Sequence, residues 1–497
     1  MTQKQTSISL GIVGAGAMGA GIAHAASASG IDVRLVDARE GAAQKACEAI
    51  GARLDKRVEQ GRLSAGEAEG TKRRLAAVRG LDELKDCDVV VEAIIEDLDA
   101  KAGLFEQLED ILRPEAVLAS NTSSIPIGAL AAGRRHRGRI AGMHFFNPVP
   151  LMKLVEVIAG PDTEEAVLDF LVDLGRRMGK TPVRVRDTPG FLVNFGGRAY
   201  PTEALAIVQE GVATPAQIDT VMRDCHGFRM GPFELMDLTG MDVNFPVTRF
   251  VHECYFYDPR LRSTPLHRYM VETGQLGRKA GRGFFRYEPE SEDVAAEPGF
   301  DAEPTARVFV HGESTVLREL MAECGAEQLD SDDGRSPILI APLGEDCTAY
   351  VCREGLDRLR TVAIDTLGDT RSRVTLMAAP GAEESIRQGV ASLLARCRKV
   401  TLIGDSPGFI GQRMVAMVAN LGCEMAQSGV ASVDDIDCAM RLGLNYPSGP
   451  LEMADALGVK NIYLILQQLQ ALTGDDRYRP SQWLRRRAQL GVSARVL

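Results

Sequence analysis

Residues 8–37 read ISLGIVGAGAMGAGIAHAASASGIDVRLVD. An apolar strand pattern leads into a glycine-rich turn, a helical run follows, and a second apolar strand ends in Asp37. The turn contains Gly14, Gly16 and Gly19, and Asp37 lies about twenty residues beyond it. A glycine triplet alone is a weak signal. With a strand before it, a helix behind it and an acid at this distance, it predicts a Rossmann-type nucleotide-binding domain.

Each glycine of this turn has a physical role that suits a dinucleotide. Gly14 permits the tight turn, Gly16 lets a pyrophosphate approach the backbone, and Gly19 lets helix and strand pack closely. The N-terminus of the helix then faces the phosphates. Asp37 would accept hydrogen bonds from the adenosine ribose and repel a 2′-phosphate, so we predict NAD rather than NADP, although Arg39 works against that preference. The alternative is a glycine turn in some other α/β protein.

Composition and charge place the chain among ordinary globular proteins. Its 497 residues are 45% hydrophobic and 25% charged. At ~150 residues per domain, this length predicts roughly three domains. Lys and Arg number 57 against 68 Asp and Glu, and the resulting net charge of −11 disfavours nucleic acid as a partner.

The sequence also bears on location and on metal chemistry. No apolar run reaches the ~18 residues that a membrane span needs, and the N-terminus lacks the pattern of a signal peptide. We therefore expect a cytoplasmic protein without membrane contact. Ten cysteines are scattered without a CxxC pair or a Cys/His cluster, so in a reducing compartment we expect neither disulfides nor a metal site.

Strand and helix patterns alternate through the rest of the N-terminal region, which predicts a parallel sheet with right-handed crossovers. Polar clusters follow two of these strands, at Asn121–Ser124 and at His144–Pro148. Since ligands gather at the carboxyl ends of parallel strands, the two clusters are the first candidates for a functional site.

His144 is the strongest candidate for a catalytic base. An enzyme that removes hydride from an alcohol needs a group that takes the hydroxyl proton, and imidazole is the usual choice near neutral pH. Of the seven histidines, only His144 follows a strand pattern with a polar neighbour, Asn147. Glu156 is the lone acid of the next strand, KLVEVI (153–158), and needs a partner if it is buried. Taken alone, the pattern leaves a catalytic His–Glu pair and a structural contact equally open.

An internal repeat with a shift of 218 residues runs through the second half of the chain. The sequence DTPGF (187–191) recurs as DSPGF (405–409), and GPFE (231–234) meets GPLE (449–452) without a gap. We therefore expect an α/β Rossmann-type domain plus two copies of an all-α helical domain, with a small α/β segment between the copies. The predicted segments are the nucleotide domain (1–186), the first helical copy (187–286), a linker (287–307), the small α/β segment (308–404) and the second helical copy (405–497).

Six motifs, in the expected order and spacing, resemble those of the 3-hydroxyacyl-CoA dehydrogenase family. They are GAGAMG (14–19), VVEAIIE (90–96), SNTSS (120–124), HFFNPVPLMKLVEV (144–157), DTPGF (187–191) with Asn194, and MGPFEL (230–235). The second repeat and the tail with DDRYRP (475–480) resemble the longer subgroup of 3-hydroxyadipyl-CoA dehydrogenases associated with phenylacetate breakdown. Close relatives of that subgroup are described as acting on 3-hydroxybutyryl-CoA.

The resemblance implies the reversible oxidation of a (3S)-3-hydroxyacyl-CoA thioester to 3-oxoacyl-CoA with NAD. It implies that His144 is the base and Glu156 its partner. Ser123 and Asn194 would hold the 3-oxygen of the substrate. The implied cofactor-binding residues are Gly14, Gly16, Met18, Gly19, Asp37, Glu96, Lys101 and Asn147.

The sequence indicates less clearly which basic residues would bind the anionic groups of such a substrate. The basic helix around Lys56, Arg57 and Arg62 is a candidate for the coenzyme A phosphates, with a solvated charged face as the alternative. The second carboxylate of an adipyl substrate would favour a cation. Arg198 or Arg229 could serve, with a solvated surface arginine as the alternative.

Three departures from the family pattern are visible. Asn194 is followed by Phe-Gly-Gly-Arg instead of an arginine and two apolar residues, and the two glycines predict a weakened helix start. Gln412 stands in the second repeat where Asn194 stands in the first, and the segment before it has no counterpart to His144. The second copy is therefore expected to be non-catalytic. The two copies either pair within one chain or support a homodimer.

Two other functions stay open at this point. In a related β-hydroxyacid or sugar-type dehydrogenase, a lysine would be the base, and the HFFNP and KLVEV motifs speak against that. A non-catalytic NAD-binding protein would have no need of His144, Glu156, Ser123 and Asn194 together.

Overall fold

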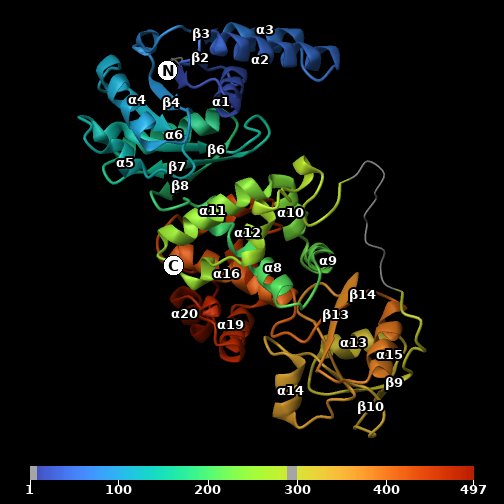
Figure 1. The fold of residues 1–497 in the computed structure, drawn as a ribbon. Helices are drawn as coiled ribbons and strands as arrows, with labels where there is room; N and C mark the ends of the chain where they lie inside the picture. Colours follow the sequence, from blue (N-terminus) through green and yellow to red (C-terminus); the bar gives the residue numbers. More distant parts are fainter. Residues whose placement is uncertain (1–7, 288–298) are drawn as a thin grey trace, which may run out of the picture. The chain divides into compact units, whose positions relative to one another are not determined.

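The structure, a computed structural model, describes residues 8–287 and 299–497 (Figure 1). The chain divides into two compact units. Unit 1 consists of Met1–Phe195 and Gly429–Leu444, and unit 2 of Gly196–Ser428 and Asn445–Leu497. A short piece of the second helical copy therefore belongs to the unit that is otherwise formed by the N-terminal part of the chain.

Unit 1 is built on an eight-stranded, mostly parallel sheet with the strand order β3-β2-β1-β4-β5-β6-β7-β8, which confirms the predicted Rossmann-type architecture. The strands are β1 (Ser9–Val13), β2 (Asp32–Val36), β3 (Leu75–Ala77), β4 (Val89–Glu92), β5 (Val117–Ser120), β6 (Ile140–Phe145), β7 (Leu154–Ala159) and β8 (Thr181–Arg186). The helices are α1 (Ala17–Ala28), α2 (Ala42–Glu59), α3 (Ala65–Arg73), α4 (Leu98–Ile111), α5 (Ile127–Ala131) and α6 (Glu165–Arg177).

The central strands of this sheet form a continuous apolar core. Leu10, Ile12, Val89 and Val91 are fully buried. Near-continuous apolar runs of this kind are typical of strands that are covered on both faces. The core holds the strand ends, where the polar clusters lie, at fixed positions.

Strand β7 is an exception, and here the prediction of a parallel sheet is wrong. β6 and β7 pair antiparallel, whereas β8 runs parallel to β7. The connection over residues 146–153 is too short for the helical crossover that a parallel pair needs, so the chain turns straight back. As a result, His144 lies directly opposite Glu156 in the sheet.

Unit 2 contains the repeated helices. The first copy supplies α8 (Ala199–Gln209), α9 (Pro215–His226), α10 (Pro232–Thr239), α11 (Met241–Cys254) and α12 (Pro265–Glu272). The second copy supplies α16 (Gly411–Gln427), α17 (Val433–Leu444), α18 (Pro450–Leu457), α19 (Val459–Thr473) and α20 (Gln482–Leu490), of which α17 lies in unit 1. Helix α16 packs against α8, so the two copies meet within one chain. None of the helices in the described part of the chain is long and apolar enough to cross a membrane.

The segment between the copies forms a second sheet with the order β10-β9-β11-β12-β13-β14. Its strands are β9 (Arg307–Val310), β10 (Glu327–Leu329), β11 (Ile338–Ile340), β12 (Thr361–Ile364), β13 (Arg373–Ala378) and β14 (Lys399–Leu402), with helices α13 (Thr315–Glu323), α14 (Cys347–Glu354) and α15 (Glu384–Ala395). β12 and β13 pair antiparallel, as β6 and β7 do. The predicted small α/β segment is therefore a reduced version of the sheet in unit 1. Most of the predicted linker, over 288–298, lies outside the described residues.

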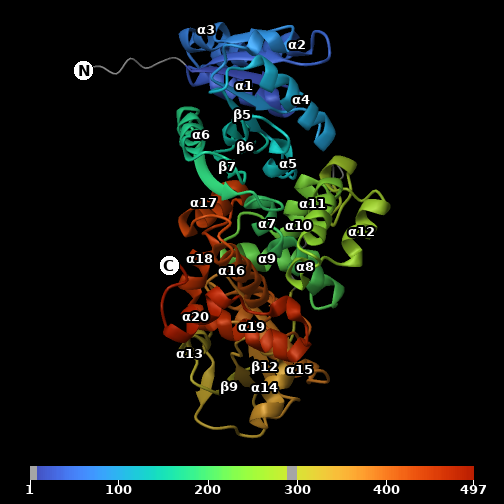
Figure 2. The same cartoon turned by 90° about the vertical axis from the view of Figure 1, so that its left-hand side faces the viewer.

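The two copies exchange a helix. Helix α17 of the second copy packs on β7 and β8 of unit 1, and Figure 2 shows it beside β7. Helix α9 of the first copy packs on β13 in unit 2. The exchange explains why the compact units do not follow the order of the repeats. The five segments predicted from sequence motifs remain predictions about the chain's domains.

The Gly-Gly sequence after Asn194 interrupts a helix, as predicted. A short helix, α7 (Val193–Gly196), ends before Gly197, and α8 begins only at Ala199. In the second copy the corresponding helix α16 is unbroken. Glycine lowers helix stability by roughly 1 kcal/mol per residue relative to alanine, which is the physical reason for the break.

Cys324 and Cys397 form a disulfide, so the expectation that this chain has none is wrong. Cys324 follows α13, Cys397 follows α15, and their Cα atoms lie 6.1 Å apart. Cys324 is buried in the core of the second sheet, and Cys397 is partly buried and packs against that core. Their separation of 73 residues gives no local sequence signal, because the two helix ends meet only in the folded chain.

Exchanging His267 for asparagine is expected to flatten the acid side of the stability profile. His267 is fully buried, and desolvation, together with the charge of Arg198, lowers its pKa from 6.5 to about 4. As pH falls from about 6.5 toward 4, the unfolded chain binds a proton that the folded chain does not. The folded state therefore loses about 2 kcal/mol between pH 7 and pH 5.

Urea unfolding of both proteins at these two pH values measures the effect. The loss in the His267→Asn variant should be smaller by about that amount. Equal losses in the two proteins would show that His267 does not stay neutral in the folded state.

Candidate functional site

The glycine turn between β1 and α1 leaves open space where a phosphate needs it. A side chain at Gly14 would overlap the carbonyl oxygen of Ala93, and one at Gly19 would overlap that of Gly14, so both positions are closed by packing. At Gly16, by contrast, a Cβ atom would have no neighbour within 4 Å. Gly16 also caps α1 without a side-chain hydrogen bond. The first turn of α1 can therefore receive an anionic group.

Asp37 follows β2 beside this turn. Its carboxylate accepts hydrogen bonds from Ala15 N (2.7 Å), Arg39 N (2.9 Å) and Arg39 Nε (3.0 Å). The hydrogen bond from the Arg39 side chain, with those from the backbone, lowers the pKa of Asp37 to about 2. Arg39 is thus ion-paired with Asp37. A negatively charged acceptor next to the glycine turn suits the two hydroxyl groups of an adenosine ribose.

His144 and Glu156 form a buried pair across β6 and β7. Nδ1 of His144 lies 2.6 Å from Oε2 of Glu156. The other carboxylate oxygen, Oε1, accepts hydrogen bonds from the backbone N–H groups of Leu192 (3.1 Å) and Val193 (2.9 Å). Glu156 therefore has partners on both oxygens. When Nδ1–H donates to Glu156, the lone pair of the imidazole lies on Nε2, where it can accept a proton.

Glu96 organises the loop that follows β5. Its Oε1 atom accepts hydrogen bonds from Thr122 Oγ1 (2.6 Å), Ser123 N (2.9 Å) and Ser124 N (3.1 Å). Burial opposes ionisation, but the hydrogen bond from Thr122 and the charge of Lys101 lower the pKa of Glu96 overall. Glu96 is therefore a charged anchor for the Ser123 loop as well as an expected cofactor contact.

Glu92 was missed by the sequence analysis. It is fully buried at the end of β4, where one oxygen accepts from Lys101 Nζ (2.6 Å) and the other from Ser120 Oγ (2.6 Å). Lys101 Nζ also lies 3.2 Å from Glu96 Oε2. Glu92 thus links the lysine to the start of the serine loop. The available signal was an acid at the end of an otherwise apolar strand, which is costly to bury without a partner.

The structure brings the Ser123 loop, Asn194 and the end of β6 together. Nδ2 of Asn194 donates a hydrogen bond to the carbonyl oxygen of Ser123 (3.3 Å). Oδ1 of Asn121 accepts from Phe145 N (2.9 Å), next to His144. All of these residues lie in unit 1. Two further expected cofactor residues, Met18 on α1 and Asn147 after β6, are half-buried and exposed, respectively.

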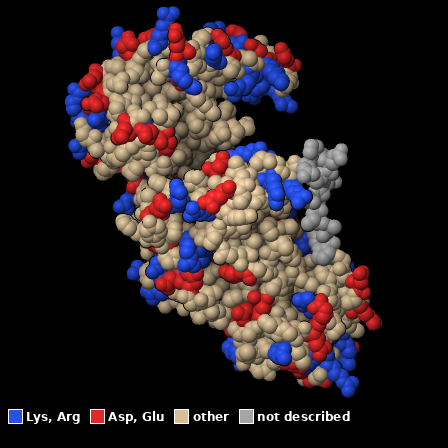
Figure 3. All heavy atoms as spheres, in the orientation of Figure 1, with Lys and Arg blue, Asp and Glu red and all other residues tan. Residues whose placement is uncertain are grey.

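The cations proposed for the substrate lie in different surroundings. Lys56, Arg57 and Arg62 are exposed at the end of α2 and in the turn after it. Figure 3 shows Lys and Arg side chains gathered at this end of α2 and α3. Arg198 is buried and donates to Thr248 Oγ1 (2.8 Å), so the alternative of a solvated surface residue is wrong for Arg198. Burial lowers the pKa of Arg198 to about 10. Arg229 is exposed.

The small α/β segment and the second helical copy carry different residues at the positions of the candidate catalytic groups. The sheet registers place Asp365 and Thr375 where His144 and Glu156 lie in unit 1. Gln412 replaces Asn194, and its Nε2 donates to Asp365 Oδ1 (2.9 Å). Asp365, which is hydrogen-bonded to the side-chain amide of Gln412, therefore occupies the position that His144 has in unit 1. Within residues 8–287 and 299–497, no three His, Cys, Asp or Glu side chains are grouped so that they could hold a metal ion.

Family models match both kinds of domain. The model described as the NAD-binding domain of 3-hydroxyacyl-CoA dehydrogenase matches residues 9–188. The model described as the C-terminal domain of 3-hydroxyacyl-CoA dehydrogenase matches residues 190–287 and again residues 408–495, which confirms the predicted duplication.

Known proteins match the chain, two of them along nearly its whole length. The 3-hydroxyadipyl-CoA dehydrogenase of Escherichia coli (strain K12) is 39% identical over 480 residues, which are 96% of this chain and 97% of that protein. A probable 3-hydroxybutyryl-CoA dehydrogenase of Deinococcus radiodurans is 42% identical over 277 residues, which are 56% of this chain and 99% of that protein. The crystal structure of 3-hydroxybutyryl-CoA dehydrogenase from Escherichia coli K12 matches with a TM-score of 0.87 at 38% identity, and the match covers 98% of this chain and 99% of that one. The chain therefore belongs to the 3-hydroxyacyl-CoA dehydrogenase family and is an NAD-dependent oxidoreductase.

Proposed function

We propose that the protein oxidises (3S)-3-hydroxyacyl-CoA to 3-oxoacyl-CoA, with His144 as the base and Glu156 as its partner. The observation that carries this proposal is the 2.6 Å contact between His144 Nδ1 and Glu156 Oε2. The contact lies at the strand end that also holds the Ser123 loop and Asn194. A buried, fully bonded carboxylate on one imidazole nitrogen leaves the other nitrogen as the proton acceptor.

Different residues of unit 1 would bind different parts of the cofactor. Gly14, Gly16, Met18 and Gly19 would hold the pyrophosphate at the start of α1, and Asp37 would accept hydrogen bonds from the adenosine ribose. Glu96, Lys101 and Asn147 would line the nicotinamide ribose. NAD, when bound, supplies the carbon that accepts hydride from C3 of the substrate.

The oxidation removes a proton from the 3-hydroxyl group and a hydride from C3. His144 Nε2 takes the proton of the 3-hydroxyl group while the C3–H bond breaks and the C3=O double bond forms. Ser123 and Asn194 hold the 3-oxygen during this step. In the reductive direction, the same residues and protonated His144 stabilise the negative charge that develops on that oxygen.

Exchanging Asp37 for alanine is expected to weaken NADH binding by roughly 10- to 100-fold. The ribose loses a charged hydrogen-bond acceptor, which is worth about 1.5–3 kcal/mol. Fluorescence titration with NADH measures the dissociation constant. Asp32→Ala, at the exposed start of β2, is the matched control and should bind NADH like the wild type. If Asp37→Ala binds NADH with unchanged affinity, Asp37 is not part of the site.

The substrate that we propose is 3-hydroxyadipyl-CoA or 3-hydroxybutyryl-CoA. The names of the similar proteins support both acyl groups, and the similarity to the 3-hydroxyadipyl-CoA enzyme extends over 96% of this chain. A comparison of kcat/KM for (3S)-3-hydroxybutyryl-CoA, a longer homologue and 3-hydroxyadipyl-CoA tests the choice. A preference for the adipyl thioester would support a role in phenylacetate catabolism, and a preference for the butyryl thioester a role in short-chain fatty acid metabolism. Equal rates with much longer acyl chains would contradict both.

We further propose that the two helical copies pair within one chain instead of forming a homodimer. The packing of α16 on α8 and the exchanged helices α9 and α17 support this arrangement. A cytoplasmic location stays a prediction from the sequence.

A further inference from the structure

Helix α17 is part of the second, non-catalytic copy, yet it packs on the sheet that carries the candidate active site. Unit 1 includes residues 429–444, and α17 contacts β7 and β8. The backbone N–H of Arg186, at the end of β8, donates to the carbonyl oxygen of Val430 (2.8 Å). A helix of the second copy therefore packs on the strand that carries Glu156.

The same arrangement is repeated in unit 2 with a shift of 218 residues. The N–H of Gly404 donates to the carbonyl oxygen of Val212 (2.8 Å), which mirrors the bond from Arg186 to Val430. Helix α9 packs on β13, as α17 packs on β7. The exchange thus occurs in both copies, but only the exchanged helix of unit 1 packs on a strand that carries a candidate catalytic residue, Glu156 on β7.

Individual contacts of the two exchanged helices correspond as well. Leu154 pairs with Thr181 in unit 1, and Arg373 pairs with Lys399 in unit 2, so Leu154 and Arg373 hold the same place in their sheets. Cys225 on α9 lies against Arg373, with Sγ 3.6 Å from its carbonyl oxygen. Its counterpart on α17 is Gly443, which lies against Leu154.

Gly443 is separated from His144 by a short chain of contacts. A Cβ atom at Gly443 would lie 2.9 Å from Leu154 Cδ2 and 3.1 Å from Val193 Cγ2. The backbone N–H of Val193 donates to Glu156 Oε1 (2.9 Å), and Glu156 Oε2 contacts His144 Nδ1 (2.6 Å). Asn194 follows Val193 directly in the chain. A side chain at Gly443 would therefore have to displace Leu154 Cδ2, the end of a flexible side chain, and the methyl groups of Val193, whose N–H binds Glu156.

We propose that Gly443, contributed by the second copy, is a positioning residue for the His144–Glu156 pair. The absence of a side chain lets α17 approach Val193 closely, and this fixes the N–H group that orients Glu156. The second copy thus completes the catalytic unit of the first without supplying a catalytic group. The proposal rests on the proposed function of the pair, and its test separates the two.

The test compares Gly443→Ala and Gly443→Val with Cys225→Val in the full chain. Cys225→Val is the matched control, because it changes the corresponding helix position beside the second sheet. We expect Gly443→Val to lower kcat by about tenfold or more, with an unchanged KM for the acyl-CoA and an unchanged Kd for NADH, because small displacements of a catalytic pair are costly. Gly443→Ala should fall between Gly443→Val and the wild type, and Cys225→Val should match the wild type.

A second-site change provides the rescue. Val193→Ala removes the two methyl groups that would lie 3.1 and 3.3 Å from a Cβ at Gly443, and the remaining contact, Leu154 Cδ2 at 2.9 Å, is the end of a flexible side chain that can turn aside. The double variant Gly443→Val/Val193→Ala should therefore regain most of the lost kcat. Wild-type kcat in Gly443→Val, an equal loss in Cys225→Val, or a double variant as slow as Gly443→Val would each overturn the proposal.

A spectroscopic readout does not depend on turnover. In the wild type, Nδ1–H of His144 should give a downfield proton resonance because it donates to Glu156, and this resonance is assigned by its loss in His144→Gln. We expect the resonance to shift upfield or broaden in Gly443→Val and to stay in place in Cys225→Val. A wild type that shows the resonance but no turnover would contradict the proposed function alone. An unchanged resonance in Gly443→Val would contradict the role of Gly443.

Discussion

Replacing His144 by glutamine is expected to lower kcat by about 10²- to 10⁴-fold, since a general base contributes this much to a proton transfer. Glutamine has an amide of similar reach, but it cannot accept the hydroxyl proton. The Kd for NADH should stay unchanged, because His144 lies at the end of β6 and not in the glycine turn. Steady-state kinetics and NADH titration of the same preparation measure both quantities.

The control for this experiment is His136→Gln. His136 is exposed in a loop of the same unit, so its exchange should leave kcat unchanged. Wild-type turnover in His144→Gln would contradict the assignment of the base and would favour a dehydrogenase with a lysine base. Binding of NADH without turnover by the wild-type protein itself would favour a non-catalytic NAD-binding protein.

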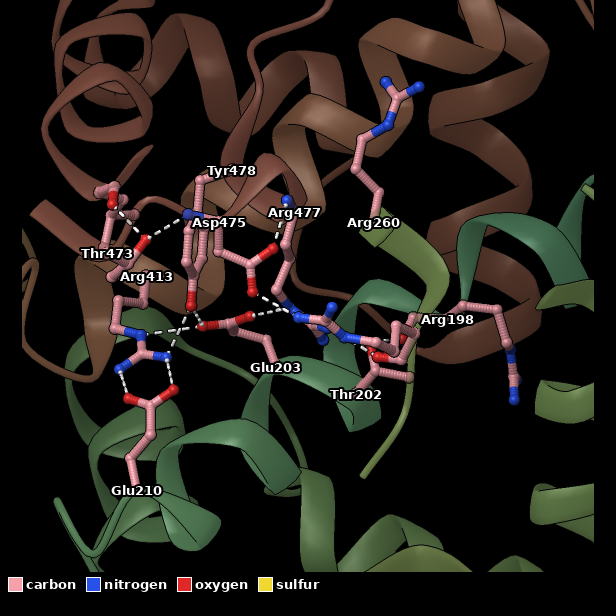
Figure 4. Close-up of polar contacts among 12 residues, drawn as sticks. Arg198, Thr202, Glu203, Glu210, Arg260, Arg413, Thr473, Asp475, Arg477 and Tyr478 are labelled. Carbon is pink, nitrogen blue, oxygen red and sulfur yellow. Dashed lines mark hydrogen bonds and ion pairs between the residues drawn. The ribbon is translucent and has the colours of Figure 1, made fainter. Parts of the chain in front are cut away.

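Replacing Glu203 by leucine is expected to lower the free energy of unfolding by about 3–5 kcal/mol, because two buried guanidinium groups lose their shared carboxylate. Glu203 on α8 is fully buried and accepts from Arg413 Nε (2.8 Å), Arg477 Nε (2.8 Å) and Tyr478 Oη (3.0 Å) (Figure 4). Arg413 lies on α16 and Arg477 in the turn after α19. The network therefore joins the two helical copies inside unit 2.

Urea unfolding measures this loss, and Glu210→Gln is the matched control. Glu210 also binds Arg413, but its side chain is 47% exposed, so this change should cost no more than about 1 kcal/mol. Replacing Glu203 together with both arginines by apolar residues should recover much of the loss, because no uncompensated charge then stays buried. A Glu203→Leu variant as stable as Glu210→Gln would show that the network does not hold the copies together.

The N-terminal half could be predicted because its signals are local. The glycine turn, the strand before it and Asp37 lie within thirty residues of each other, and their spacing follows from the geometry of one strand–turn–helix unit. The polar clusters at the ends of β5 and β6 could be found for the same reason, since a parallel sheet brings its strand ends together. Glu156 was singled out by the cost of burying a lone acid, and His144 by its place after a strand pattern with a polar neighbour.

What could not be predicted depends on contacts between distant segments. The repeat revealed the duplication, but identical motifs in both copies do not tell which copy's α9 or α17 packs on which sheet. The partner of Cys324 lies 73 residues away and is chosen by the packing of two helix ends. The direction of β7 is a different case: alternation of strands and helices predicts only parallel strands, but the short connection over 146–153 is a local signal that excludes a crossover. Glu92 also has a local signal, an acid at the end of an apolar strand, but its partners Lys101 and Ser120 are brought to it only by the fold.

The central claim is that this chain transfers hydride from a (3S)-3-hydroxyacyl-CoA to NAD. The most direct test is the formation of NADH by the purified wild-type protein with (3S)-3-hydroxybutyryl-CoA, the (3R) enantiomer and (3S)-3-hydroxyadipyl-CoA, each with NAD and with NADP. The account predicts NADH formation from at least one (3S) thioester, none from the (3R) enantiomer, and a clear preference for NAD. No NADH from any (3S) thioester, in a preparation that binds NADH, would contradict it.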